Sequence, residues 1–401
     1  MPHPKVYLAI DNCFASKRWT APAQWAAIVR DLGLTCVEAS ADNECDALYA
    51  DPGYLSDWLD QCRLAAEATG VHVVNVYSGH GTYATLGLGH IDRRCRDRIQ
   101  HEWIERMIDS ASALGAGAGF YCHAFDQKTL ETYEAYSAAE EELYARLREI
   151  AQYAANKRLP AIGLEQMYAP HQIPWTIDGA ERLLRKVFDD VPFYLSLDTG
   201  HQVGQRRFVR PTEEEIARRA KEYKTTGRTP GMWLGTQRAY QIFRDSADGG
   251  DAKMQAGMKG VQAEMDEHPY LFAKEEDGDL YAWARRVGRY CPIVHLQQTD
   301  GKRSAHQPFT DEFNARGIVD PAKLLRAMAA SFATEPGGGN YPGGNYPPAC
   351  ERVCLTLEIF SATMDMPEDI LSRLADSVAY WRRFVPRDGL PLDELAAACG
   401  A

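Results

Sequence analysis

The sequence predicts a single α/β domain folded as a (β/α)8 TIM barrel, with a long insertion after the sixth strand. Apolar runs of four to seven residues alternate with amphipathic stretches, a pattern typical of β-α units on a parallel sheet. Several of these runs stop at a carboxylate, an imidazole or an amide. In barrels of this kind the carboxyl ends of the strands carry the chemistry, so both observations indicate the same fold class.

Eight apolar runs supply the predicted strands. In chain order they are residues 6–10, 35–38, 71–77, 117–122, 161–165, 193–198, 293–297 and 353–358. Amphipathic stretches between them predict helices, and the clearest are residues 22–32, 55–69, 96–114, 138–157 and 178–188. Residues 367–384 predict a closing helix after the eighth strand. Eight such units match the barrel count, so we expect one domain over residues 1–401.

Two segments interrupt the alternation of predicted strands and helices. Residues 205–290 are far too long for one crossover and contain helical stretches at 213–223 and 252–265. We expect them to form an insertion at the catalytic face, acting as a lid or an oligomer contact. Residues 336–348 repeat the unit Gly-Gly-Asn-Tyr-Pro, which is incompatible with a helix interior or a central strand and predicts a loop.

Composition and charge exclude several functional classes. The net charge is −12, which argues against nucleic-acid or anionic-membrane binding, because both need a basic face. No apolar run approaches the roughly 20 residues that span a bilayer, and the first residues lack the pattern of a signal peptide. The ten cysteines show no paired framework and are interpreted as reduced thiols. We therefore expect a cytoplasmic protein that acts on a small molecule. The large insertion leads us to expect a homo-oligomer.

Three carboxylates end predicted strands and are the first candidates for a functional site. Glu165 ends the fifth strand, Asp198 the sixth and Glu358 the eighth. Gathered at one rim, they would repel each other without a cation, and a hard divalent ion suits such oxygen-rich sets. On the seventh strand His295 and Gln297 alternate, so they face the same side and either could join the group.

Other polar residues at strand ends are candidates for substrate binding. His201 lies three residues after Asp198, at a strand-to-helix turn that would direct both side chains into one pocket. Further candidates are Asn12, Lys17, His80, His123 and Arg303, for which structural or surface roles stay open. Tyr121 and Phe125 could form a sugar-binding wall with His123, or simply belong to the core. Lys17, Arg18, Lys302 and Arg303 could hold a substrate phosphate or remain solvated surface charge.

The order Leu-Glu165, Leu-Asp198-Thr-Gly-His201, Val-His295-Leu-Gln297 and Leu-Glu358-Ile-Phe resembles the xylose isomerase-like barrel superfamily. Within it the chain is most similar to sugar or sugar-phosphate isomerases and 3-epimerases of the tagatose/psicose type. The resemblance covers roughly residues 5–205 and 290–385, which leaves the insertion outside it.

The resemblance implies a metal site made from the Glu of strand five, the Asp of strand six, a His of strand seven and the Glu of strand eight. Family members carry an Arg six residues after the ligand His, and here Arg303 lies six residues after Gln297. Gln297 is therefore the slightly favoured ligand, with His295 as the alternative. His171 stands where many epimerases have a substrate-binding Glu. The implied cofactor is one divalent ion, first Mn2+ and otherwise Mg2+ or Co2+.

The mechanism implied by the resemblance is proton transfer next to a carbonyl through an enediolate. Glu165 and Glu358 would act as acid and base on opposite faces of one carbon, while His201 and Arg303 hold substrate oxygens. The most specific expectation is a tetrulose or pentulose phosphate 3-epimerase. Two alternatives stay open: an endonuclease IV-type enzyme with several zinc ions, for which His80, His123, His295 and His306 would be ligands, and a sugar-binding barrel without catalysis.

Overall fold

The computed structural model describes residues 3–79, 86–228, 231–247, 249–334 and 344–400. Its centre is a closed barrel of eight parallel strands in chain order, in which β1 pairs with both β2 and β8. The strands are β1 (Lys5–Asp11), β2 (Cys36–Ser40), β3 (His72–Ser78), β4 (Gly117–Phe120), β5 (Ile162–Glu165), β6 (Tyr194–Asp198), β7 (Ile293–Leu296) and β8 (Arg352–Leu357). All eight predicted strands are present, and the predicted fold class is confirmed.

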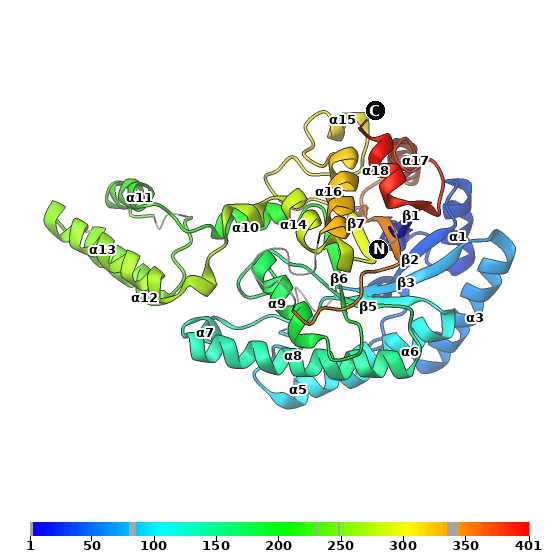
Figure 1. Ribbon diagram of the computed structural model, residues 1–401, viewed down its shortest axis with the longest axis horizontal. Coiled ribbons are helices and arrows are strands. Elements are labelled where there is room, and N and C mark those ends of the chain that lie inside the picture. Colours follow the sequence, from blue (N-terminus) through cyan, green and yellow to red (C-terminus); the bar gives the residue numbers. More distant parts are fainter. Residues whose placement is uncertain (1–2, 80–85, 229–230, 248, 335–343, 401) are drawn as a thin grey trace.

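Helices surround the barrel on its outer side (Figure 1). They include α1 (Pro22–Asp31), α3 (Pro52–Thr69), α5 (Arg93–Arg98), α6 (Glu105–Leu114), α8 (Tyr133–Asn156), α9 (Ile177–Val187), α14 (Leu280–Val287), α16 (Pro321–Ala333) and α17 (Pro367–Arg382). Residues Ile99–Ile104 form a π-helical stretch between α5 and α6, within the single helix predicted there. Thr132 and Thr176 cap α8 and α9 by accepting a first-turn backbone N–H, which fixes where each helix begins.

Shorter elements complete the loops at the ends of the strands. They are η1 (Asn12–Ala15), α2 (Ala41–Glu44), α7 (Gln127–Leu130) and α15 (Asp311–Asn314). After α17 the chain adds β9 (Leu390–Pro391), which pairs antiparallel with the start of β1, and α18 (Leu392–Ala398). The last strand and helix were not predicted, because two paired residues and a two-turn helix leave too short a pattern to recognise.

The core consists of side chains on both faces of the barrel strands. Every residue of β2, β4, β5, β6 and β7 is buried, as expected for a sheet covered by helices on the outside and filled by side chains on the inside. Trp58 of α3, Trp283 of α14 and Trp381 of α17 are almost completely buried. This packing holds the carboxyl ends of the strands in a fixed arrangement.

The insertion between β6 and β7 is confirmed. It contains α10 (Gln202–Gln205), η3 (Arg206–Phe208), α11 (Glu213–Thr226), α12 (Gln237–Ala247), α13 (Asp251–Glu267), η4 (Pro269–Leu271), η5 (Glu275–Gly278), α14 and η6 (Gly288–Tyr290). Helices α11, α12 and α13 project away from the barrel, at the left of Figure 1. They share their own buried cluster, which includes Ile216, Phe243 and Val261. The role of this arm as a lid or an oligomer contact stays a prediction.

The structure also bears on the expectations for the cysteines, for membrane-spanning helices and for the repeated loop. All ten cysteines are free thiols. No helix in the described part of the chain is long and apolar enough to cross a membrane. Most of the Gly-Gly-Asn-Tyr-Pro repeat lies outside the described residues, and so does His80. Residues 344–348 of that repeat have no regular secondary structure, which agrees with the predicted loop.

Candidate metal centre and active site

Four buried side chains converge inside the barrel at the carboxyl ends of β5 to β8. Glu165 and Asp198 are the last residues of β5 and β6, His295 lies within β7, and Glu358 directly follows β8. Each offers one ligand atom, and these atoms all lie within 4.8 Å of one another. The predicted convergence of the three carboxylates is therefore present, with an imidazole beside them.

His295 links two carboxylates from different strands. Its Nδ1 lies 2.7 Å from Glu165 Oε1, and its Nε2 lies 2.9 Å from Glu38 Oε1. The imidazole is completely buried, so both contacts form away from water. The other oxygen of Glu165 accepts a hydrogen bond from the hydroxyl of Tyr77, whose ring packs edge-on against His295. Glu165 is thus held on both oxygens by groups inside the barrel.

Asp198 is fixed by the turn that follows its strand. Its Oδ1 accepts the backbone N–H groups of Gly200 and His201 at 2.7 and 2.9 Å. Nε2 of Gln297 lies 2.8 and 2.9 Å from the two carboxylate oxygens. The ring of His201 is held through Nδ1, 2.7 Å from the carbonyl oxygen of Gln166, and its Nε2 lies 3.9 Å from Asp198 Oδ1. The predicted proximity of His201 to Asp198 is present.

The charges in this buried group perturb one another. Burial raises the pKa of Asp198, although His201 and His306 oppose the rise. Burial also acts to raise the pKa of Glu358, but the imidazoles of His295 and His306 outweigh it and the pKa lies below its ordinary value. For His295 the carboxylates outweigh burial, led by Glu358, and the pKa is raised well above its usual range. The site therefore attracts positive charge strongly.

The donor set fits a hard divalent cation. Three carboxylates with a neighbouring imidazole match the oxygen-rich sets, tolerant of one nitrogen, that bind Mn2+ or Mg2+. Oε2 of Glu358 is buried and lies 3.3 Å from Nδ1 of His306 and 3.7 Å from Nδ1 of His295. Imidazoles therefore approach this carboxylate oxygen, and a bound cation would compensate its buried charge in the same way.

Gln297, predicted as the strand-seven ligand, lies at the group but has its amide engaged. Its Oε1 accepts the backbone N–H groups of Ala305 and His306 at 2.9 and 2.6 Å, while its Nε2 faces Asp198. An oxygen with two backbone donors already in place is a poor candidate for binding an ion. His295, the alternative, is the residue of β7 that belongs to the converging group.

Three of the predicted substrate-binding residues have polar atoms engaged within the protein, although Nδ1 of His123 is buried without a hydrogen-bond partner among the described residues. Asn12 is completely buried, donates to Glu44 and accepts the backbone N–H of Ser40. His123 is also completely buried, contacts the carbonyl of Ile173, and burial lowers its pKa to about 4. For His123, Tyr121 and Phe125 the core interpretation therefore holds. Nδ1 of the half-buried His171 lies 2.7 Å from the carbonyl oxygen of Phe125.

The four basic residues considered for phosphate binding are engaged elsewhere or exposed. Arg18 donates to the backbone carbonyls of Ala362 and Asp365, so it holds the loop after β8. Lys17 is exposed, and Lys302 is exposed and paired with Asp300 at 3.4 Å. Arg303 is exposed and lines a hollow with Phe313 and Arg316, and none of the converging carboxylates lines that hollow. Exposure agrees with the alternative of solvated surface charge, and phosphate binding by these residues stays a prediction.

Two residues of the site, Glu38 and Tyr77, were not predicted as part of it, and His306 was predicted only as a zinc ligand in the endonuclease IV-type alternative. Glu38 and Tyr77 end the second and third predicted strands, so the rule that selected Glu165 could have found them. His306 lies in the loop after β7, with Nδ1 3.3 Å from Glu358 Oε2. Burial lowers its pKa, but Glu358 and other carboxylates outweigh this and raise it to about 9. No periodic signal marks a residue in an irregular loop.

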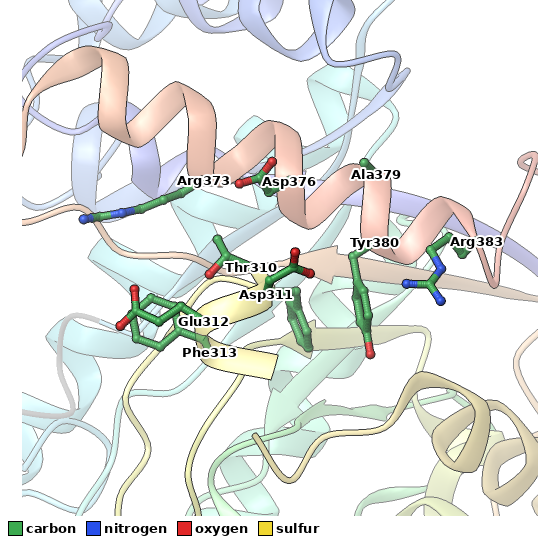
Figure 2. A pocket seen from close by; sticks show the side chains of 10 residues that line it. Thr310, Asp311, Glu312, Phe313, Arg373, Asp376, Ala379, Tyr380 and Arg383 are labelled. Atoms are coloured by element: carbon green, nitrogen blue, oxygen red, sulfur yellow. The ribbon is translucent and has the colours of Figure 1, made fainter. Parts of the chain in front are cut away.

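A separate hollow of about 550 Å3 lies on the outside of the molecule, between α15 and α17 (Figure 2). Arg373 and Arg383 stand at its two ends, with Asp311, Glu312 and Asp376 among the residues that line it. None of the four converging residues lines this hollow, and its acidic and basic side chains are mixed. The carboxyl ends of the strands remain the candidate site.

Comparison with known proteins agrees with this geometry. The sequence model of the xylose isomerase-like TIM barrel family matches residues 26–227, half of the chain, so the chain belongs to that family. A D-erythrulose 1-phosphate 3-epimerase of Brucella abortus (strain 2308) is 31% identical over 121 residues. That match covers 30% of this chain and 34% of the relative, so the similarity spans about a third of the relative's length.

Solved structures show the same fold at low sequence identity. A protein from Rhodospirillum rubrum ATCC 11170, provisionally called a xylose isomerase, superposes with a TM-score of 0.66 at 17% identity and covers 94% of this chain and 99% of that one. D-allulose 3-epimerase from Methylomonas sp. gives a TM-score of 0.53 at 14% identity and covers 96% and 99%. At these identities the likeness establishes the barrel architecture alone.

Proposed function

We propose that the protein is a metal-dependent isomerase that acts on a sugar or a sugar phosphate, most specifically a ketose phosphate 3-epimerase. The observation that carries the proposal is the buried convergence of Glu165, Asp198 and Glu358 with an imidazole beside them. A binding protein has no need for two carboxylates from different strands facing one small volume. The 3-epimerase named among the relatives supports the choice of a ketose phosphate as substrate.

Glu165 and Glu358 are the proposed acid and base. One removes the proton from a carbon next to the substrate carbonyl and the other returns a proton to the opposite face, which inverts that carbon. Tyr77 and His295 hold Glu165 on both of its oxygens, which fixes the direction from which it meets the substrate. His201 faces Asp198 from the turn after β6 and would hold a substrate oxygen.

Glu165, Asp198 and Glu358 would hold the divalent ion, which supplies a positive charge beside the oxygens where negative charge develops. The side chains of Glu165, Asp198 and Glu358 are buried, so the electrostatic interactions among them are stronger than in water. Mn2+ is the first choice for such a set, with Mg2+ and Co2+ as alternatives. If the proton returned to the neighbouring carbon instead, the reaction would be an aldose–ketose isomerisation.

A substrate panel tests the proposal. Protein loaded with Mn2+ is incubated with tetrulose and pentulose phosphates and with the matching free ketoses, and products are separated by chromatography. We expect epimerisation of at least one ketose phosphate, which disappears when a chelator removes the ion. Absence of turnover on every ketose and ketose phosphate, by a protein shown to contain its metal, would contradict the proposal.

A further inference from the structure

His306 and Glu358 form a buried ion pair within the acidic group. Nδ1 of His306 lies 3.3 Å from Oε2 of Glu358, and the same oxygen lies 3.7 Å from Nδ1 of His295. Apart from such charge contacts, neither Nδ1 of His306 nor Oε2 of Glu358 makes a hydrogen bond to another described residue. The pair therefore marks a place where a divalent ion could replace the proton between an imidazole and a carboxylate.

The ring of His306 is held in place from three directions. Its backbone adopts a left-handed conformation with φ of 46°, which is uncommon for a residue other than glycine. Its N–H donates to Oε1 of Gln297 at 2.6 Å. Its imidazole stacks on Phe360, with ring centroids 4.0 Å apart and an angle of 12° between the planes. Such strain persists where the surroundings enforce it, and it concentrates at functional sites.

Gln297 connects this loop to the acidic group. One end of its amide accepts the N–H groups of Ala305 and His306, and the other end lies within 2.9 Å of both oxygens of Asp198. A Cβ added at Gly200 would lie 2.5 Å from the amide carbon of Gln297, so the amide fits closely against the turn after β6. Gln297 therefore fixes His306 relative to Asp198 while its own oxygen is in use.

His295 is differently placed from His306. Both of its ring nitrogens contact carboxylate oxygens, Glu165 on one side and Glu38 on the other. An imidazole that bridges two buried carboxylates in this way serves as an internal cation, and it would have to give up one of these contacts to bind an ion. Nδ1 of His306 has a longer contact, 3.3 Å to Oε2 of Glu358, and is the more easily released nitrogen.

We propose that His306 supplies the nitrogen donor to the metal held by Glu165, Asp198 and Glu358, and that Gln297 is the positioning residue that delivers it. This inference rests on the metal site of the proposed function and deepens it. It assigns the nitrogen ligand to a loop residue nine positions after Gln297 rather than to strand β7.

Pulsed electron paramagnetic resonance of the Mn2+-loaded protein tests the assignment, because it detects nitrogen coupled to the ion without requiring turnover. We expect a coupled histidine nitrogen in the wild type that is lost in His306→Ala and His306→Gln, with metal affinity lowered by at least about tenfold. His101→Ala is the control, since His101 is exposed and pairs with Glu105. Circular dichroism confirms that each variant is folded.

The opposing result is equally specific. A nitrogen coupling that persists in both His306 variants and disappears in His295→Gln would overturn the assignment. A wild-type protein that binds no Mn2+ at all would instead remove the metal site itself, and with it the proposed function. The two failures are therefore distinguishable in the same experiment.

Gln297→Leu separates positioning from direct coordination. If Gln297 acts through His306, Gln297→Leu loses the nitrogen coupling. The double variant Gln297→Leu/His306→Ala then binds the metal less than about threefold more weakly than His306→Ala alone, because the effects of residues that act as a unit are not additive. If Gln297 binds the ion through its own oxygen, Gln297→Leu weakens binding but keeps the nitrogen coupling. That second pattern would overturn the positioning role.

Discussion

Glu165 and Glu358 reach the same buried volume from strands β5 and β8, yet their surroundings differ. Glu165 is held by Tyr77 and His295, whereas Oε2 of Glu358 forms a longer ion pair, 3.3 Å from Nδ1 of His306. A carboxylate that is held on both oxygens keeps its position, and one in a longer ion pair can exchange that partner for an ion or a substrate proton. The two glutamates are therefore suited to complementary tasks in one proton transfer.

Replacing either glutamate by glutamine should abolish turnover without unfolding the protein. The amide keeps the size of the side chain but cannot accept or return a proton, so we expect kcat to fall by roughly 10²–10⁴-fold. Glu102→Gln, on the exposed surface and paired with Arg106, is the matched control. Steady-state kinetics measures the change. Activity above a few per cent in Glu165→Gln or Glu358→Gln would contradict the two-glutamate scheme.

Metal binding should release protons and weaken as the pH falls. The pKa of His306 is raised to about 9, so this imidazole carries a proton at neutral pH that the ion must displace. We expect affinity to fall by up to about tenfold per pH unit below pH 9 for each displaced proton. Isothermal titration calorimetry in buffers of different ionisation enthalpy counts the protons. A pH-independent affinity between pH 6 and 9 would contradict this account.

The metal-free protein should show the opposite dependence in its stability. The pKa of His306 is higher in the folded state than the ordinary value of 6.5. Its pairing with Glu358 therefore stabilises the fold fully below pH 6.5, and this contribution is lost as the pH rises through about 9. Urea unfolding of wild type and His306→Gln across this range measures the difference. Parallel curves for the two proteins would show that the pairing contributes nothing.

At the scale of elements, the sequence predicts the strands better than the loops. All eight strands are visible as apolar runs, because burial on both faces removes polar residues from them. Glu165, Asp198 and Glu358 follow from the same pattern, since a short carboxylate at the end of such a run lies near the barrel mouth. His306 could not be predicted as a member of this group in the same way, because the path of its loop depends on Gln297 and Phe360.

The arm formed by α11, α12 and α13 should behave as an element with its own stability. Phe243 and Val261 lie in a buried cluster separate from the barrel core. We expect Phe243→Ala to cost about 3–5 kcal/mol within the arm. Hydrogen exchange should accelerate across residues 213–267, while β5 to β8 and metal binding remain unchanged. Equal acceleration in the barrel strands would show that the arm and barrel unfold together.

At the scale of the whole molecule, the acidic group makes the barrel depend on a cation. Five buried carboxylates, Asp11, Glu38, Glu165, Asp198 and Glu358, lie in the barrel at or near the carboxyl ends of its strands. Burial, Glu38 and Glu358 raise the pKa of Asp11 well above its ordinary value, which reflects their mutual repulsion. A divalent ion relieves this repulsion in the folded state alone.

Metal should therefore stabilise the entire fold. At a free Mn2+ concentration about a thousand times its dissociation constant, binding adds about 4 kcal/mol to the free energy of unfolding. We expect the melting temperature to rise on adding Mn2+ and to return on adding a chelator. Differential scanning calorimetry measures both steps. In Glu358→Gln the rise should shrink, and an unchanged rise in that variant would place the ion elsewhere.

The central claim is a proton transfer at the carbon next to a ketose carbonyl, and deuterium exchange tests it most directly. The Mn2+-loaded protein is incubated with a ketose phosphate in D2O and followed by proton NMR. The account predicts that solvent deuterium enters at that one carbon as the epimer forms, and that Glu165→Gln and Glu358→Gln remove this incorporation. Epimer formation without deuterium from solvent, or exchange that survives in both variants, would contradict it.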